Sequence, residues 1–296
     1  MFFILFYTLN KFLSFAFLAK RADEVGIAIF HTLFNLFKIA LLSHQTKLLA
    51  NLSRKIIKDK PEDIEVMDNK GQVPELDEIF LDKPSFAMEQ CKNVASKMAA
   101  TAKESLAASI SLISNFDMEV YDTVIEKEEI VDNYEDKLAT YMLKLSSHEL
   151  TEADSKELSL LFHIIGDFER ISDHAVNIAK SSKKMNKKEM MFSKKAESEM
   201  EVFSDLIMDI MDTSIECFIN GDENLATYVE PMEEVVDKLN KEIKKRHVKR
   251  LRKGKCTIDM GFVLADITTD FERIATISSS TPNLVDFQKL IFSSTT

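Results

Sequence analysis

Four polar residues in one short stretch of this sequence could bind a metal ion. Glu169, Asp173 and Asn177 follow one another at intervals of four, and Asp167 lies two residues before the first of them. On a helix, residues four apart share one face, and carboxylates placed this way repel each other. Either Arg170 and nearby lysines neutralise that repulsion or a cation does; a solvated acidic face is the simpler alternative. Oxygen ligands suit hard cations, so we expect Glu169 and Asp173 to bind a divalent or ferric ion (iron, manganese or magnesium). Asp167 and Asn177 would support them.

The same pattern recurs in part 103 residues later. Asp266, Asp270 and Glu272 repeat part of the pattern. Thr276 and Ser280 occupy the positions that correspond to Asp173 and Asn177. We therefore expect this second motif to bind a metal weakly or not at all.

The two motifs belong to an internal repeat. Residues 167–171 and 270–274 share the sequence DFERI, and residues 128–132 and 233–237 are EEIVD and EEVVD. Two landmarks at nearly one spacing indicate a duplicated unit. Leu, Ile, Val, Met and Phe at three- and four-residue intervals predict three long helices in each unit. The expected helices cover residues 86–116, 118–145, 152–182, 188–219, 224–252 and 257–277.

The composition also favours helices. Only 6 Gly and 5 Pro occur in 296 residues, which leaves few residues for the many turns of a β-protein. We predict an all-α fold with two tandem three-helix bundles, at residues 85–186 and 187–296. Pro282 should end the last helix, followed by an atypical C-terminal tail.

Charge and missing motifs exclude several classes of function. Residues 61–296 carry 46 Asp and Glu against 29 Lys and Arg, and so acidic a body disfavours nucleic acid as a partner. The 3 cysteines lie far apart, which predicts neither a disulfide framework nor a zinc knuckle. The sequence lacks a Gly-rich phosphate loop, HExxH, GxSxG and the paired ExxH motifs of di-iron bundles. We therefore expect no enzymatic activity.

The first 45 residues differ from the rest of the chain. Residues 2–19 and 25–42 are apolar runs, each close to the shortest length that spans hydrocarbon at roughly 1.5 Å per residue. We expect one or two membrane-embedded helices at residues 1–45. A signal peptide is the alternative for the first run, but that run has no basic start. His31 and Asn35 lie one helical turn apart and form a polar stripe, either at a helix–helix contact or along a water-filled path.

Residues 46–84 combine a basic juxtamembrane helix with a polar linker. Lys47, Arg54 and Lys55 begin the basic cluster, and Pro61 and Pro74 lie in the linker. Basic residues beside a membrane span favour the cytoplasmic side. We therefore expect the protein at the cell membrane, with its helical body in the cytoplasm.

Residues 167–179, DFERISDHAVNIA, resemble the signature of the PhoU family. Members of that family are paired three-helix bundles whose ExxxD motifs bind metal clusters. Residues 20–35 and 246–273 resemble parts of bacterial sodium-dependent phosphate cotransporters, namely the last membrane region and the C-terminal PhoU-like domain. The resemblance implies a regulatory, metal-binding domain in phosphate transport, partnered by the transporter core or other membrane helices. A homo-oligomer is also compatible with it.

Two departures from the cotransporter pattern bear on the expected function. The upstream helices, with the Gln- and Ser-rich repeats that bind sodium and phosphate, are missing, and the FERIA segment at residues 271–275 continues into an unrelated sequence. We therefore expect a truncated or frame-shifted form that keeps a remnant of the transporter core at residues 1–45 and does not transport alone. The alternative is a non-catalytic helical adaptor that docks a membrane partner through its acidic surface without metal.

Overall fold

The computed structural model describes Pro74 and residues 76–293. These residues form a short 3-10 helix and long α-helices, with no strand among them. The elements are η2 (Glu78–Asp82), α4 (Pro84–Ser114), α5 (Met118–Leu145), α6 (Glu152–Lys187), α7 (Lys194–Asn220), α8 (Glu223–Arg252) and α9 (Ile258–Ser293). The predicted all-α fold and its six long helices are confirmed.

The predictions for the head of the chain lie outside the described residues. They concern the membrane-embedded helices at residues 1–45, with His31 and Asn35, and the basic segment that begins at residue 46. Among the helices that are described, none is both long enough and apolar enough to cross a bilayer.

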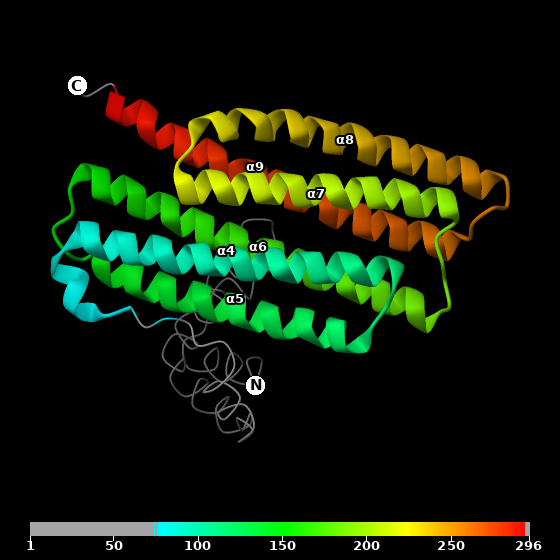
Figure 1. Cartoon of the computed structure of the whole chain (residues 1–296), viewed down its shortest axis with the longest axis horizontal. Helices are drawn as coiled ribbons and strands as arrows, with labels where there is room; N and C mark the ends of the chain where they lie inside the picture. Colours follow the sequence, from blue (N-terminus) through cyan, green and yellow to red (C-terminus); the bar gives the residue numbers. More distant parts are fainter. Residues whose placement is uncertain (1–73, 75, 294–296) are drawn as a thin grey trace, which may run out of the picture. The chain divides into compact units, whose positions relative to one another are not determined.

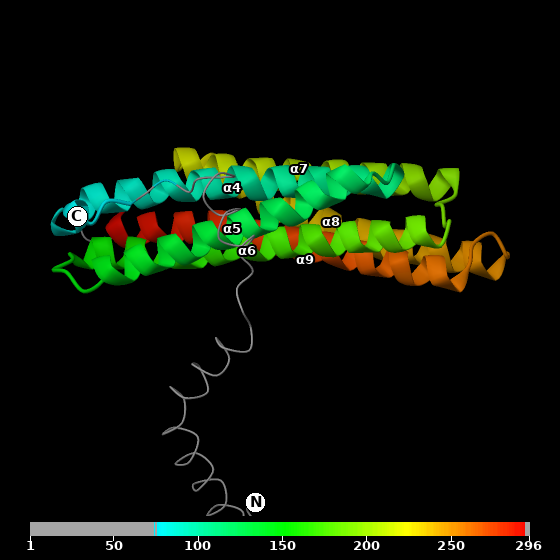
Figure 2. The same cartoon turned by 90° about the horizontal axis from the view of Figure 1, so that it is seen from below.

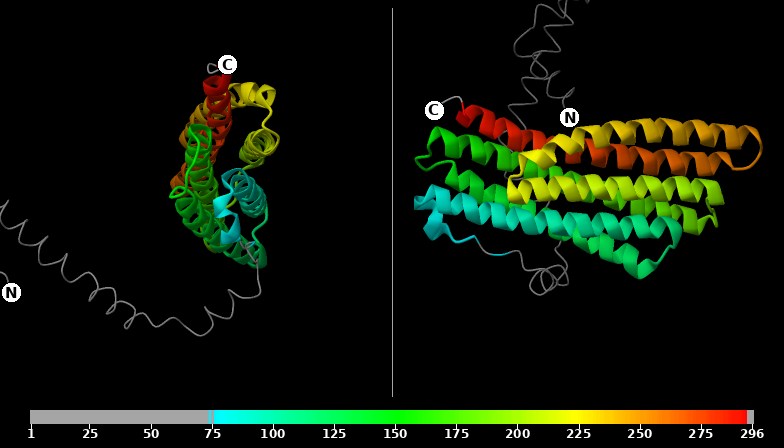
Figure 3. Two further views of the ribbon diagram at one scale, coloured as in Figure 1. Left: turned by 90° about the vertical axis from the view of Figure 1, so that its left-hand side faces the viewer. Right: turned by 45° about the horizontal axis from the view of Figure 1, so that its top comes forward.

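The six helices pack as two three-helix bundles (Figure 1). Helices α4, α5 and α6 contact one another, and so do α7, α8 and α9. The bundles meet where α6 packs on α9 and α4 packs on α7. All six helices run roughly along one direction (Figure 2), and the end-on view in Figure 3 shows the two contacts between the bundles.

Aromatic side chains connect the helices inside a continuous core. The rings of Phe168 and Phe218 meet edge to face at 5.8 Å and join α6 to α7. Phe203 and Phe271 meet in the same way at 5.2 Å and join α7 to α9. Offset and edge-to-face ring pairs stabilise a core beyond the area they bury. The two bundles therefore share apolar packing and form one compact unit.

Side-chain caps fix where several helices begin and end. Thr151 and Asp154 form a reciprocal capping box at the start of α6, which satisfies backbone N–H groups that have no partner within the helix. Ser193 caps α7, so this helix begins at residue 194 and the predicted start at residue 188 is wrong. Gly221, with φ 61°, ends α7 in the left-handed conformation that glycine adopts without strain.

The last helix continues past Pro282, so the prediction that this proline ends it is wrong. Helix α9 runs from Ile258 to Ser293. A proline has no N–H for the carbonyl four residues earlier, which here belongs to Ser278. Ser214 of α7 donates its hydroxyl to that carbonyl at 2.7 Å. A side chain from another helix therefore supplies the hydrogen bond that the proline cannot.

Replacing Ser214 with alanine should lower the free energy of unfolding by about 1–2 kcal/mol, because a buried carbonyl loses its donor. Ser214 is only 1% exposed, so water cannot take its place. Urea unfolding of the purified protein measures the effect. Ser198→Ala is the matched control, since Ser198 lies on the same helix but is exposed and bonds only to its own helix. Equal effects of the two substitutions would contradict this account of how α9 continues.

Candidate metal centre

Carboxylates from two neighbouring helices face one another in the first bundle. The charge of Asp173 on α6 acts on Glu128 and Asp132 of α5. The charges of Asp132 and Glu135 act in turn on Glu169. Glu128, Glu135 and Glu169 are half-buried, whereas Asp132 and Asp173 are exposed. We call these residues the acidic face: Glu128, Asp132, Glu135, Glu169 and Asp173.

Burial and mutual repulsion shift the ionisation of this face. The pKa of Glu128, Asp132, Glu135 and Glu169 is raised above the ordinary value, first by burial and then by the neighbouring carboxylates. None of the five side chains forms an ion pair or a side-chain hydrogen bond with another described residue. A bound cation would relieve the repulsion and favour the charged forms.

The pH dependence of stability should reveal this repulsion in metal-free protein. Because folding raises the pKa of Glu169, its contribution favours the folded state below the ordinary pKa of 4.5 and is lost as the pH rises through the higher folded value. Glu169→Gln removes that loss. We expect the variant to gain stability over the wild type between about pH 4 and pH 7, measured by urea unfolding in chelator.

Glu152→Gln provides a control of opposite sign. The pKa of Glu152 is lowered, mainly by its hydrogen bond with Lys156. Its stabilisation is therefore present above the ordinary pKa and lost as the pH falls. At neutral pH this variant should be less stable than the wild type, not more stable. If Glu169→Gln behaved like Glu152→Gln, the acidic face would not be repulsive.

The donor set of the acidic face fits a hard cation, because it offers only carboxylate oxygens. The side chains do not converge as they stand: no group of three or more His, Cys, Asp or Glu within the described part of the chain is arranged to hold a metal ion. Three of the carboxylates, Glu128, Glu135 and Glu169, are partly exposed, and the other two are exposed. Rotamer changes of these side chains would be needed to close a ligand set.

The structure places the four predicted ligands on two sides of α6. Glu169 and Asp173 lie in the acidic face, and Asn177 is exposed one turn further along the helix. Asp167 lies at the contact with α9, where it is 5% exposed and accepts a hydrogen bond from Ser280 Oγ at 2.6 Å. Two positions along a helix correspond to about 200° of rotation. Asp167 therefore joins the two bundles and is not brought together with the acidic face.

In the second unit, the corresponding carboxylates have hydrogen-bond donors within the protein. Glu272 accepts a hydrogen bond from Asn240, and Glu233 accepts one from Ser279 Oγ at 2.6 Å. Asn240 occupies the place that Glu135 has in the first unit. An amide has thus replaced a carboxylate, and the repulsion found in the first unit is reduced.

The other carboxylates of the second motif lie apart from Glu272. Asp266 is exposed on α9. Asp270 lies across from α6, with its Oδ1 2.9 Å from Nδ1 of His174. Thr276 replaces the second carboxylate. These placements favour the expectation of weak or no metal binding, which remains a prediction.

Sequence reasoning did not assign the three carboxylates that α5 contributes to the acidic face. Glu128 and Asp132 have the same ExxxD spacing as Glu169 and Asp173. That spacing, within a segment already marked by the repeat, is the signal that could have identified two of them. Glu135 follows Asp132 by three residues, which also places it on that helix face. Its closeness to Glu169 depends on how α5 packs against α6.

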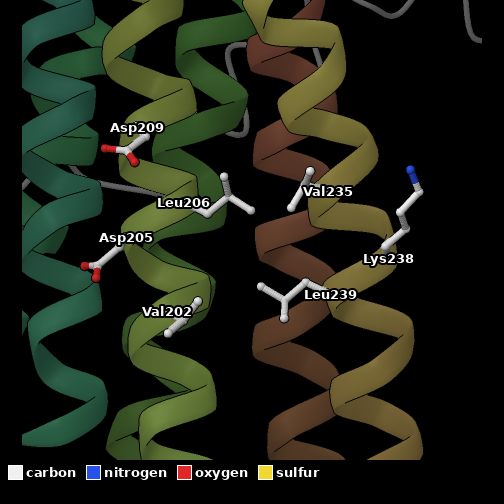
Figure 4. Close-up of a pocket in the computed structure, with 7 residues that line it drawn as sticks. All are labelled: Val202, Asp205, Leu206, Asp209, Val235, Lys238 and Leu239. Atoms are coloured by element: carbon white, nitrogen blue, oxygen red, sulfur yellow. The ribbon is translucent and has the colours of Figure 1, made fainter.

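A groove of about 540 Å³ runs between α7 and α8 of the second bundle. Figure 4 shows that Val202 and Leu206 of α7 face Val235 and Leu239 of α8 across it. The carboxylates of Asp205 and Asp209 point away from these side chains, and Lys238 lies on the outer side of α8. The groove is therefore an apolar seam between helices, and the acidic face is the candidate site.

Within the described part of the chain, these features define a class of protein: an all-helical pair of three-helix bundles whose first bundle carries an acidic face without ion pairs. The chain belongs to the family of the PhoU domain. The family model matches residues 95–182 and 201–281, which together make up more than half of the chain. Each match falls within one of the two bundles, as the internal repeat requires.

Relatives and solved structures agree with this family. The chain is 24% identical over 188 residues to "Phosphate-specific transport system accessory protein PhoU homolog 1" of Thermotoga maritima, covering 62% of this chain and 78% of that protein. It is 22% identical over 187 residues to a PhoU homolog of Aquifex aeolicus, covering 63% and 83%.

Two crystal structures share the fold. PhoU from Pseudomonas aeruginosa superposes with a TM-score of 0.64 at 16% identity and covers 69% of this chain and 97% of its own. PhoU from Streptococcus pneumoniae superposes with a TM-score of 0.63 at 14% identity, covering 70% and 97%. The predicted PhoU-like fold is thereby confirmed.

Proposed function

We propose that this chain regulates phosphate transport as the cytoplasmic PhoU-like domain of a sodium-dependent phosphate transporter, and that it does not transport alone. The observation that carries the proposal is the PhoU match in both bundles. The relatives from Thermotoga maritima and Aquifex aeolicus are named as accessory proteins of phosphate-specific transport systems. The likeness of residues 20–35 to the last membrane region of sodium-dependent cotransporters supports the narrower assignment.

The proposal includes a location and a partner. The apolar head would hold the protein at the cell membrane, and the helical body would lie in the cytoplasm against a transporter core or other membrane helices. Regulation would require no reaction, so we propose a protein without enzymatic activity. The packing between the two bundles and a metal ion bound at the acidic face would set how the protein regulates the transporter.

A metal site at the acidic face is supported by unpaired charge. Glu169 and Asp173 would bind the ion together with Glu128 and Asp132. The ion would add to the positive charge of Arg170 and Lys180, which offsets the repulsion only in part. Iron, manganese and magnesium all accept such oxygen ligands. Asn177, one turn beyond Asp173, would complete the polar environment.

Phosphate uptake in a deletion strain tests the regulatory role. Deleting the coding sequence should change the uptake of labelled phosphate, and returning the wild-type gene should restore it. Replacing sodium with potassium in the medium tells whether the transporter concerned depends on sodium. Uptake that is unchanged by deletion in phosphate-rich and phosphate-poor media would overturn the proposal. An effect that persists without sodium would overturn only the assignment to a sodium-dependent transporter.

A further inference from the structure

One end of the described unit is strongly basic, although the chain as a whole has a net charge of −11. The connection from α6 to α7 carries exposed lysines that form no ion pair with another described residue, apart from a contact between Lys188 and Asp259 at 3.6 Å. These lysines are Lys184, Lys187, Lys188, Lys194 and Lys195. The acidic residue within this connection is Glu189.

The connection from α8 to α9 adds a second basic segment at the same end. Residues 244–258 contain 8 Lys and Arg and no Asp or Glu. Four of these side chains are exposed and have no acidic partner among the described residues: Lys249, Arg252, Lys253 and Lys255. The ion pair between Lys188 and Asp259 places the two connections next to each other, and Figures 1 and 2 show both at one end of the helices.

Large apolar side chains project from this basic end. Met191 is 86% exposed in the connection from α6 to α7. Ile258 and Phe262 are 66% and 61% exposed, and they lie four residues apart on one face at the start of α9. An exposed apolar side chain alone needs no explanation. Three of them, in the two connections that carry the exposed lysines and arginine, form a surface with two chemistries, cationic and apolar.

The connection from α7 to α8, at the opposite end of the unit, lies beside an exposed aromatic side chain but has no basic neighbours. Tyr228 is 63% exposed near the start of α8. Its neighbours in sequence include Asp222 and Glu230, and the connection from α7 to α8 contains no Lys or Arg. The clustering of several unpaired cations with three exposed apolar side chains is not repeated at this connection.

We propose that the basic end is a docking surface for an anionic phospholipid bilayer. Clustered Lys and Arg are attracted to anionic headgroups, and apolar side chains beside them enter the boundary between headgroups and acyl chains. Met191, Ile258 and Phe262 would make that insertion. A nucleic acid would also attract the cations, but its backbone offers no apolar medium for these three side chains. The docking does not depend on the metal site.

A tryptophan placed at the basic end would report the docking, because the chain contains no Trp. Full-length protein with Phe262→Trp is mixed with vesicles of phosphatidylcholine, with or without phosphatidylglycerol. With the anionic vesicles, we expect the emission of residue 262 to shift to shorter wavelength and to be quenched by brominated lipid. Tyr228→Trp at the opposite end is the matched control and should show neither change. Vesicle binding by the apolar head would be common to both Trp variants, so a response at residue 262 that is absent at residue 228 reports the basic end.

Charge reversal tests the role of the cations. In the Phe262→Trp protein, Lys253→Glu with Lys255→Glu should weaken the response to anionic vesicles by about tenfold or more. Lys97→Glu with Lys137→Glu makes the same change of net charge at exposed lysines of α4 and α5 and should leave the response unchanged. The proposal is overturned if residue 262 stays accessible to an aqueous quencher with anionic vesicles. It is also overturned if both Trp positions respond alike, or if an oligonucleotide protects residue 262 and vesicles do not.

Discussion

Protein in which Glu169 and Asp173 are both replaced with alanine is expected to lose a metal ion that the wild-type protein carries at near-stoichiometric level. The two residues supply the α6 side of the acidic face, and the remaining carboxylates on α5 would bind a cation too weakly to retain it through purification. Elemental analysis of full-length protein purified without chelator measures the loss. Asp266→Ala with Glu272→Ala is the matched control in the second unit and should keep the metal.

The stability of the same proteins separates loss of a ligand from loss of structure. A ligand that binds only the folded state raises the free energy of unfolding by about 2.7 kcal/mol at a hundredfold excess over Kd. The wild type should show this rise when the metal is added, and the Glu169/Asp173 variant should not. In chelator the variant should be at least as stable as the wild type, because a repulsion has been removed. Full metal content in the variant would contradict the site; a metal-free wild type would favour the helical adaptor.

The helices could be predicted from the sequence because each one carries its own signal. The apolar periodicity of a long helix and the caps at its start are local features, and the start and end predicted for α5 are those observed. The end of α9 could not be predicted in this way. The donor that replaces the missing N–H of Pro282 is Ser214, 64 residues from the carbonyl it serves. A contact of that kind exists only after α7 and α9 have packed.

The candidate site could be predicted in part for the same reason. Four-residue spacing placed Glu169 and Asp173 on one face of a single helix, and the charge of Asp173 does act on Glu169. Asp167 is close to Glu169 in sequence, but it lies on another side of α6 and accepts a hydrogen bond from Ser280. The contribution of α5 depends on how two helices pack. That packing sets which carboxylates meet, and a pattern within one helix does not contain it.

The two units differ in whether their equivalent carboxylates accept hydrogen bonds from other side chains. In the second unit, Asn240 and Ser279 donate hydrogen bonds to Glu272 and Glu233. The equivalent side chains of the first unit have no such donor among the described residues. Carboxylates that repel each other in a fold are a cost to stability unless a ligand offsets it. A duplicated fold has thus kept one unit with internal hydrogen bonds and one with unpaired charge.

Replacing Arg250 with alanine is expected to destabilise the protein strongly, because it leaves a buried charge without its partner. Nη1 of Arg250 lies 3.0 and 2.8 Å from the two carboxylate oxygens of Glu199. The two side chains are only 12% and 13% exposed. Removing one partner of such a pair costs about 3–5 kcal/mol. Arg246, at 3.5 Å from Glu199, compensates in part, so we expect about 3 kcal/mol in urea unfolding.

Replacing both partners should restore most of that stability. Nε and Nη2 of Arg250 are buried and have no hydrogen-bond partner among the described residues, so the wild-type ion pair does not satisfy all of its own groups. A buried pair of this kind is often matched or surpassed by apolar side chains of similar volume. We therefore expect Glu199→Leu with Arg250→Met to unfold at a urea concentration close to that of the wild type. Lys238→Ala, which breaks the exposed pair with Glu234, should change stability by less than about 1 kcal/mol. A double variant as unstable as Arg250→Ala would mean that the arginine stabilises this end of α8 by its packing and not by its charge.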